Sequence, residues 1–425
     1  MIKTSCFIVC LLMAPLLHAD VAVAEFDPVA ATNAQLAVVS PEASANTDGY
    51  VNAGYQTMLL EPLLTVIVAF LLLQLGWSRR WRELAERAVK WRFLQAFIYV
   101  PIYLLVTTAL LFPFSWYRDF HIEHKYGLAT QDFGAWFVEF LQSTGVALVG
   151  MSLFVGVLYL ILRWSPQRWW MWGAGLVVGF IALLLLVSPL YIEPIFNEYR
   201  PMDEGPLKER ILSIARANGM SADDVKQVDQ SKQTTRVSAN VSGMLGTTRI
   251  ALNDNLLKRA SPDGVEAVMA HEIGHYVLNH QWKSITYFAL IFGASFAAAN
   301  ALFLVIVRRR GAGWDVRGVD DYAGFPLLYA IITVIVFLAT PLLYRITYIN
   351  EYEADLFAIN ATQNPEAWAE VALMTAEYRK LHPPQWEESL LNHHPSPYVR
   401  IFTAMRWKAE NLPAADDSEL VVESR

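Results

Sequence analysis

The chain has 425 residues, of which 55% are hydrophobic and only 17% charged, and its formal charge is −7. A typical soluble domain carries about 25% charged residues, so this composition excludes a disordered chain and argues against a wholly soluble one. The acidic balance offers no basic surface for nucleic acid. The only cysteines, Cys6 and Cys10, lie in the first apolar block, which excludes a disulfide framework and a thiolate metal cluster.

Residues 1–24 have the three parts of a secretory signal peptide. Lys3 precedes an apolar run over residues 6–17, and Ala22-Val23-Ala24 offers a small-residue cleavage site. An uncleaved membrane anchor is the alternative, although the run is short for a membrane span. Residues 25–56 are rich in Ala, Val, Asn, Asp and Pro without sustained periodicity, so we expect a flexible leader there.

Six long apolar stretches follow, and each can cross roughly 30 Å of hydrocarbon as a helix. They cover residues 58–77, 93–116, 145–162, 170–192, 285–307 and 325–344, which places four spans within 57–192 and two within 285–346. We therefore expect a mainly α, polytopic membrane protein with six transmembrane helices, or seven if the first segment is retained. Two polar regions, 193–284 and 347–411, and an acidic tail, 412–425, complete the chain.

Positive charge is sorted to one side of these spans. The loops after the first, third and fifth spans lie on the same side and carry twelve Lys and Arg residues, whereas the opposite short segments carry two, Arg118 and Lys125. The positive-inside rule makes the arginine-rich loops cytoplasmic. Both polar regions then face outward, so we expect an integral protein of a bacterial inner membrane with these regions in the periplasm.

The first polar region contains a candidate metal helix. Ser261-Pro262 predicts its start, because Ser is a good N-cap and Pro fits the first turn. The helix continues into a His-Glu-Ile-Gly-His motif, in which His271 and His275 project from one face and can bind one zinc ion. Glu272 is placed to take a proton from a water molecule activated by the metal. Two surface histidines on a helix are the alternative.

A zinc ion needs a third protein ligand, and the second polar region offers Glu351 and Asp355. These carboxylates are four residues apart on a stretch with helical character, so one can bind the metal while the other orients a ligand imidazole. Glu353 points elsewhere by the same geometry, and a plain acidic helix face is the alternative. His280 lies one residue off the ligand face, so we interpret it as a supporting or solvent-facing residue.

Taken in chain order, the motifs resemble those of the type I CAAX prenyl endopeptidases, a family of multispanning zinc metalloproteases. Besides the two candidate ligand helices, the likeness rests on segments 120–128, 193–197 and 278–280 and on His394-Pro395 with Arg400. The resemblance implies an α+β zinc metalloprotease domain attached to the spans. It implies that Glu351 binds the zinc and Asp355 supports a histidine, while His394 and Arg400 contact the substrate and the oxyanion.

The resemblance also implies a substrate-binding strand. In this chain Ser238 and Asn240 replace the Asn and Tyr that the family usually carries there. The stretch 244–252 can also pair with an extended substrate as an added edge strand, or it can be an interior strand.

The expected function is a membrane-embedded, zinc-dependent endopeptidase with one Zn²⁺ per chain, which acts on membrane or exported proteins. Its partners are the protein substrate and the lipid bilayer. The alternative is a catalytically silent membrane chaperone or scaffold that retains the zinc fold, and the presence of Glu272 favours the enzyme. Prenylated CAAX substrates are cytosolic, so an outward-facing catalytic domain argues against them.

Overall fold

The computed structural model describes residues 26–220, 224–242 and 249–412. The predicted signal peptide and the acidic tail beyond Leu412 lie outside the described residues. The helices are α1 (Pro28–Leu36), α2 (Pro41–Gln74), α3 (Trp77–Ala88), α4 (Arg92–Trp116), α5 (Ile122–Lys125), α6 (Phe133–Trp164), α7 (Trp169–Val187), α8 (Glu193–Phe196), α9 (Pro206–Ala217), α10 (Asp254–Arg259), α11 (Pro262–Val277), α12 (His280–Trp314), α13 (Phe325–Thr362), α14 (Pro365–Met374), α15 (Gln385–Leu390) and α16 (Pro397–Asn411). The strands are β1 (Tyr199–Pro201), β2 (Val225–Val228), β3 (Ala239–Ser242) and β4 (Arg249–Asn253).

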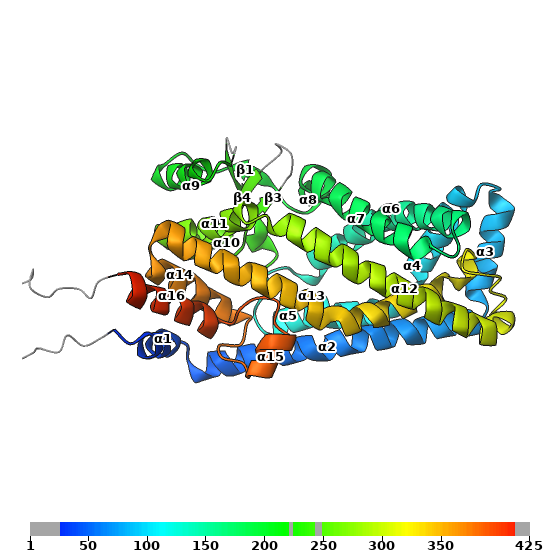
Figure 1. The fold of residues 1–425 in the computed structure, drawn as a ribbon, viewed down its shortest axis with the longest axis horizontal. Helices are drawn as coiled ribbons and strands as arrows, with labels where there is room; N and C mark the ends of the chain where they lie inside the picture. Colours follow the sequence, from blue (N-terminus) through cyan, green and yellow to red (C-terminus); the bar gives the residue numbers. More distant parts are fainter. Residues whose placement is uncertain (1–25, 221–223, 243–248, 413–425) are drawn as a thin grey trace, which may run out of the picture.

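Within the described residues, six helical segments are long and apolar enough to cross a membrane, which confirms the six predicted spans. They contain α2, α4, α6, α7, α12 and α13, and these helices run along the long axis of the molecule (Figure 1). Large apolar side chains such as Phe70, Val149 and Leu338 are more than half exposed on them. Such side chains face lipid in a membrane protein, so the mainly α, polytopic fold is confirmed.

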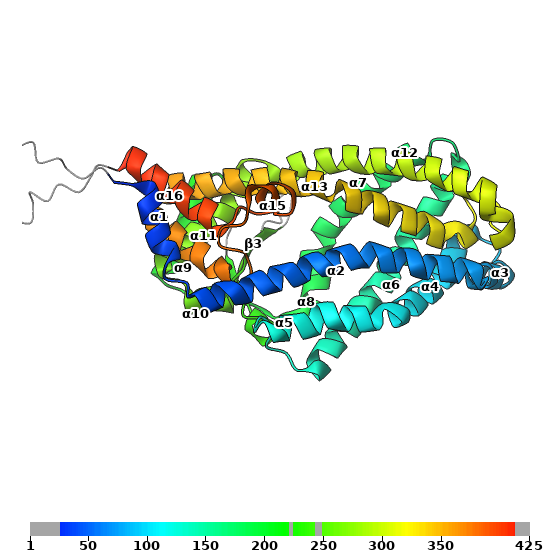
Figure 2. The same ribbon diagram turned by 90° about the horizontal axis from the view of Figure 1, so that it is seen from below.

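The prediction of a flexible leader over residues 25–56 is wrong, because most of this segment is helical. Asp27 caps α1 and Ser40 caps α2, which then continues without a break into the first span. α1 packs along α16 (Figure 2), and the Thr47 hydroxyl donates a hydrogen bond to the Ala376 carbonyl at 2.7 Å. Capping and these long-range contacts stabilise helices whose sequence has too few apolar residues to show periodicity.

A four-stranded sheet in the order β1–β2–β4–β3 lies between α7 and α12 in the chain. β2 and β4 are parallel, and the other neighbouring pairs are antiparallel. Residues 244–252 were expected to form either an edge strand or an interior strand. Residues 244–248 lie outside the described residues, and the rest belongs to β4, which is an interior strand. Val265, Met269 and Ile273 of α11 share a buried apolar cluster with Ile250 of β4, which anchors α11 on the sheet.

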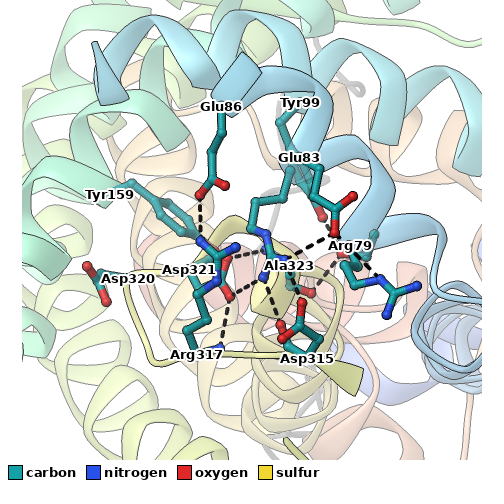
Figure 3. A network of polar contacts seen from close by, with 12 residues as sticks. Arg79, Glu83, Glu86, Tyr99, Tyr159, Asp315, Arg317, Asp320, Asp321 and Ala323 are labelled. Atoms are coloured by element: carbon teal, nitrogen blue, oxygen red, sulfur yellow. Dashed lines mark hydrogen bonds and ion pairs between the residues drawn. The ribbon is translucent and has the colours of Figure 1, made fainter. Parts of the chain in front are cut away.

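The end of the bundle away from the sheet is held by a buried polar network (Figure 3). Arg82 of α3 is only 1% exposed, and its guanidinium donates to the Asp321 carboxylate at 2.9 Å and to the Asp315 carboxylate at 2.7 Å. The Ser78 hydroxyl donates to the Ala323 carbonyl at 2.7 Å. These bonds tie α3 to the connection between α12 and α13.

Candidate metal centre

Helices α11 and α13 bring three ligand-type side chains together. α11 begins where the sequence predicts, since the Ser261 hydroxyl accepts a hydrogen bond from the Gly264 amide at 3.0 Å. The Nε2 atoms of His271 and His275 lie 3.2 Å apart. Glu351 of α13 places Oε2 3.3 Å from Nε2 of His271 and Oε1 3.5 Å from Nε2 of His275. These three side chains form a cluster that can hold a metal ion.

The separations in this cluster fit a tetrahedral zinc ion. With Zn–N bonds of about 2.0–2.1 Å, two ligand atoms on a tetrahedron lie about 3.3 Å apart. The 3.2 Å between the two imidazole nitrogens and the 3.3 and 3.5 Å from each of them to one oxygen of Glu351 are close to this spacing. Two imidazoles and one carboxylate are also a donor set of catalytic zinc sites, which keep the fourth position open. The residues present therefore fit one metal ion.

Gly274 lets the two ligand helices approach each other. A Cβ atom at this position would lie 3.0 Å from the Phe357 ring of α13 and 3.2 Å from its Cβ atom. Contacts this short would force one helix away, because a bulky ring packed between two helices has little room to move. The glycine within the metal motif therefore sets the helix spacing on which the distance to Glu351 depends.

Two charged residues, Asp355 and Arg400, lie behind the ligands. Asp355 is fully buried, and its Oδ1 lies 2.9 Å from Nδ1 of His271. Arg400 of α16 donates to Oε2 of Glu351 at 3.1 Å, and its Nε lies 3.2 Å from Oδ2 of Asp355. The guanidinium thus lies between the two carboxylates. The packing of α16 directs Arg400 onto this acidic pair, and its expected contact with the substrate stays a prediction.

Trp368 of α14 was not singled out by the sequence. Its indole stacks on the His271 ring at a centroid distance of 5.2 Å, and the Arg400 guanidinium lies 5.4 Å from it. The side chain is 1% exposed, so it fixes both neighbours by packing. An apolar residue in a helix gives no sequence signal for such a contact, since it depends on how α14 and α11 pack.

Glu272 lies beside the cluster and next to the edge of the sheet. α11, which carries Glu272, packs against β3. Burial raises the pKa of Glu272 to about 7, and the Glu351 charge adds to this effect, while His271 and, slightly, the Val241 backbone of β3 oppose it. A carboxylate with this pKa is well suited to exchange protons near neutral pH.

The predicted strand residues Ser238 and Asn240 belong to this edge of the sheet. The Ser238 amide donates to Oδ1 of Asn253 at 3.0 Å, and its carbonyl accepts from the Asn253 amide at 2.9 Å. Asn240 lies opposite Ala251 in the antiparallel pair of β3 and β4. Both side chains are exposed. β3 is an outer strand of the sheet, so its other edge is unpaired within the described sheet.

His394 lies between the metal cluster and a cavity, and it contacts Glu351. Its Nε2 lies 3.3 Å from Oε2 of Glu351. Burial, reinforced by the Arg379 charge, holds the pKa of His394 well below its usual range, so the ring is neutral. His393, His394 and Arg379 line a cavity of about 670 Å³. Burial also lowers the pKa of Arg379 to about 10.

Glu353 lies outside the donor cluster, as the sequence predicts, but it contacts a residue that supports the cluster. Its Oε2 lies 3.0 Å from Nε2 of His280. Nδ1 of His280 in turn lies 2.9 Å from Nδ1 of His275. The chain turns sharply at Asn279, which adopts φ of +58°, so α11 ends before His280 and α12 begins there. A continuous helix, which the sequence suggested, would not bring His280 and Glu353 together.

Metal binding is expected to release about one proton at pH 8. Burial opposes protonation of His271, but the Asp355 and Glu351 carboxylates outweigh it and raise the pKa of the metal-free ring to about 9. Burial and the His271 charge lower the pKa of His275 to about 3, so this ring is already neutral. The metal displaces the His271 proton, so its apparent affinity should rise about tenfold per pH unit below pH 9.

Titration calorimetry with zinc, in buffers of different ionisation enthalpy, measures the number of protons released. The Asp355→Asn variant is the control, because it keeps all three ligands but lacks a carboxylate that raises the pKa of His271, so it should release less than one proton. Release of no proton by the unmodified chain would contradict this assignment of charge.

Two family models match the chain. Residues 29–198 match the CAAX prenyl protease N-terminal model, which is described as five membrane helices, and residues 201–408 match peptidase family M48. A Bacillus subtilis relative, described as the uncharacterized metalloprotease YhfN, is 28% identical over 383 residues, or 90% of this chain and 89% of the relative. CAAX prenyl protease 1 of Saccharomyces cerevisiae is 30% identical over 192 residues, or 44% of this chain and 41% of the relative.

A solved structure is similar in fold. The crystal structure of S. mikatae Ste24p matches with a TM-score of 0.71 at 20% sequence identity, covering 86% of this chain and 89% of that one. The two family models follow one another along the chain and together span the membrane helices and the metal cluster. The chain therefore belongs to peptidase family M48 and is a membrane metalloprotease with the N-terminal membrane domain of the CAAX prenyl proteases.

Proposed function

We propose that the protein is a zinc endopeptidase that cleaves membrane or exported proteins on the outer side of a bacterial inner membrane. The observation that carries this proposal is the cluster of His271, His275 and Glu351, whose donor atoms are 3.2–3.5 Å apart, with Glu272 beside it. A scaffold that only retained the fold would have no use for Glu272, so the enzyme is the function that these residues favour.

The catalytic role of Glu272 follows from its position and its pKa. A zinc ion held by the three ligands supplies Lewis acidity, which lowers the pKa of a water molecule and polarises a peptide carbonyl. Glu272 takes the proton from the attacking water and passes it to the amine of the leaving peptide. Burial raises the pKa of the carboxyl, to about 7 in the metal-free site, and this raised pKa helps the carboxyl both to accept and to give up a proton.

The neighbouring residues support this reaction in different ways. Asp355 orients His271 through the 2.9 Å contact with Nδ1, which fixes the proton on the atom that does not face the metal. Arg400 holds Glu351 and Asp355 in place. His394 borders the cavity with its Nε2 near Glu351, so it is the residue that we assign to the oxyanion.

β3 is the strand that we propose to bind the substrate. An extended peptide can add to the unpaired edge of a sheet through backbone hydrogen bonds. β3 is an outer strand and packs against α11, which carries Glu272, so a peptide paired with β3 would run near the general base. The exposed side chains of Ser238 and Asn240 lie in the same segment and can contact the substrate.

The outward orientation of the catalytic domain is supported by charge. The basic helix α3 and the connection between α12 and α13 lie at the end of the bundle opposite the sheet and α11 (Figure 1). The positive-inside rule places that end in the cytoplasm. Prenylated CAAX proteins are made in the cytosol, so we propose exported and membrane proteins as substrates instead.

The test compares cells that carry the unmodified protein with cells that carry Glu272→Gln. Proteomics of the membrane and exported fractions should reveal proteins that accumulate uncleaved only in the variant, with cut sites on the outer side of the membrane. Cut sites in cytoplasmic segments would contradict the orientation. Identical cleavage patterns in the two strains would contradict the proposed protease function.

A further inference from the structure

We propose that His280 and Glu353 are positioning residues that hold His275 in the orientation needed to bind the metal. This inference rests on the proposed metal site and extends it to a second row of side chains on α12 and α13. Neither residue reaches the cluster of donor atoms itself, which comprises His271, His275 and Glu351.

The three side chains form a continuous chain of contacts away from the metal cluster. Nδ1 of His275 lies 2.9 Å from Nδ1 of His280, and Nε2 of His280 lies 3.0 Å from Oε2 of Glu353. Lys283, one turn along α12, places its Nζ 3.0 Å from the same carboxylate oxygen. Each imidazole in this chain therefore uses both of its ring nitrogens.

Only one arrangement of protons satisfies these contacts when the metal is held by Nε2 of His275. That atom offers its lone pair, so the ring proton is on Nδ1 and is donated to Nδ1 of His280. His280 then carries its own proton on Nε2 and donates it to the Glu353 carboxylate. The carboxylate thus selects the tautomer of His275 through an intervening ring.

The two metal imidazoles are supported by different routes. His271 contacts the buried carboxylate of Asp355 directly. His275 is near the end of α11, and the turn at Asn279 brings His280 between it and α13. His280 is 3% exposed, whereas the Glu353 side chain is 41% exposed. Through His280, the partly exposed carboxylate of Glu353 therefore affects the proton position and orientation of His275.

A purely structural role for His280 is the competing explanation, because a buried ring at the corner between α11 and α12 also contributes packing. The two roles differ in what Glu353 does. Its carboxylate is partly exposed and lies one contact beyond His280, so changing it to the isosteric amide alters charge and hydrogen bonding but hardly any packing. The positioning role predicts that this exchange weakens metal binding.

The experiment measures the zinc dissociation constant of the purified full-length chain by chelator competition, with the melting temperature of the metal-free form recorded for each variant. Supporting partners of metal ligands typically contribute 10- to 100-fold in metal affinity. We expect Glu353→Gln to weaken zinc binding about 10-fold and His280→Ala about 10- to 100-fold. Glu353→Asp, which retains the carboxylate, should recover part of the loss. The absorption spectrum of the cobalt-substituted protein should change in the same variants.

Glu366→Gln is the matched control, because Glu366 forms a surface ion pair with Lys408 on the remote helices α14 and α16. It should bind zinc as the unmodified chain does. An unchanged zinc affinity in Glu353→Gln would overturn the positioning role of His280 and Glu353. Equal losses of zinc affinity in Glu353→Gln and Glu353→Asp would overturn it as well. If His280→Ala does not fold, the two Glu353 variants decide alone. Absence of zinc binding by the unmodified chain would instead refute the metal site on which both proposals rest.

Discussion

Glu272→Gln is expected to lower kcat for peptide cleavage by about 10²- to 10⁴-fold while the zinc content stays at one ion per chain. The amide has the size of the carboxyl group but cannot accept a proton from water. The metal ligands are untouched, because the metal cluster consists of His271, His275 and Glu351. Cleavage of a peptide by the purified protein, with metal analysis of the same samples, measures both quantities.

A control on the same helix separates catalysis from folding. Glu266 lies on α11 and forms an ion pair with Arg210 away from the metal cluster, so Glu266→Gln should keep full activity. In the unmodified protein, kcat/KM should fall at low pH, since protonation of Glu272 removes the base. The positive charge of the metal places this fall below pH 7, because the pKa of about 7 belongs to the metal-free site. Turnover by Glu272→Gln at the unmodified rate would rule out Glu272 as the base.

Arg82→Ala is expected to lower the free energy of unfolding by about 3–5 kcal/mol, although Arg82 lies at the opposite end of the bundle from the metal centre. Its guanidinium is 1% exposed and pairs with Asp321, which is 5% exposed. Removing it leaves a buried carboxylate without its partner. The midpoint of unfolding in detergent, followed by circular dichroism, measures the loss.

Arg80→Ala provides the comparison, because Arg80 lies on the same helix with an exposed side chain. It should change the free energy of unfolding by less than about 0.5 kcal/mol. The double variant Arg82→Met with Asp321→Asn removes both charges and should recover much of the stability. A loss in Arg82→Ala no larger than in Arg80→Ala would show that the network of Figure 3 contributes little to stability.

The sequence predicts those features that depend on local order along the chain. Hydropathy locates the six spans because a helix must reach across the hydrocarbon. His271 and His275 are found because four residues bring side chains to one face of a helix. Glu351 was paired with them through its own spacing to Asp355 and through resemblance, and the structure brings all three donors together.

Features that depend on packing between distant segments were missed or misplaced. The place of Arg400 between Glu351 and Asp355 was missed, because it depends on how α16 packs. Glu353 lies outside the donor cluster as expected, but its contact with His280 was missed, because the left-handed turn at Asn279 has no clear signal in the sequence. The helices within 25–56 were missed since their stability comes from caps and from contacts with the C-terminal region.

Because α13 is one continuous helix, its length sets the distance between the membrane and the metal site. One uninterrupted helix begins at Phe325, beside the polar connection, and carries Glu351 about 26 residues later, which is roughly 39 Å at 1.5 Å per residue. The hydrocarbon layer is about 30 Å thick, so with Phe325 at one boundary Glu351 lies about 10 Å beyond the other. The enzyme would then select peptide bonds by their height above the lipid as well as by their side chains.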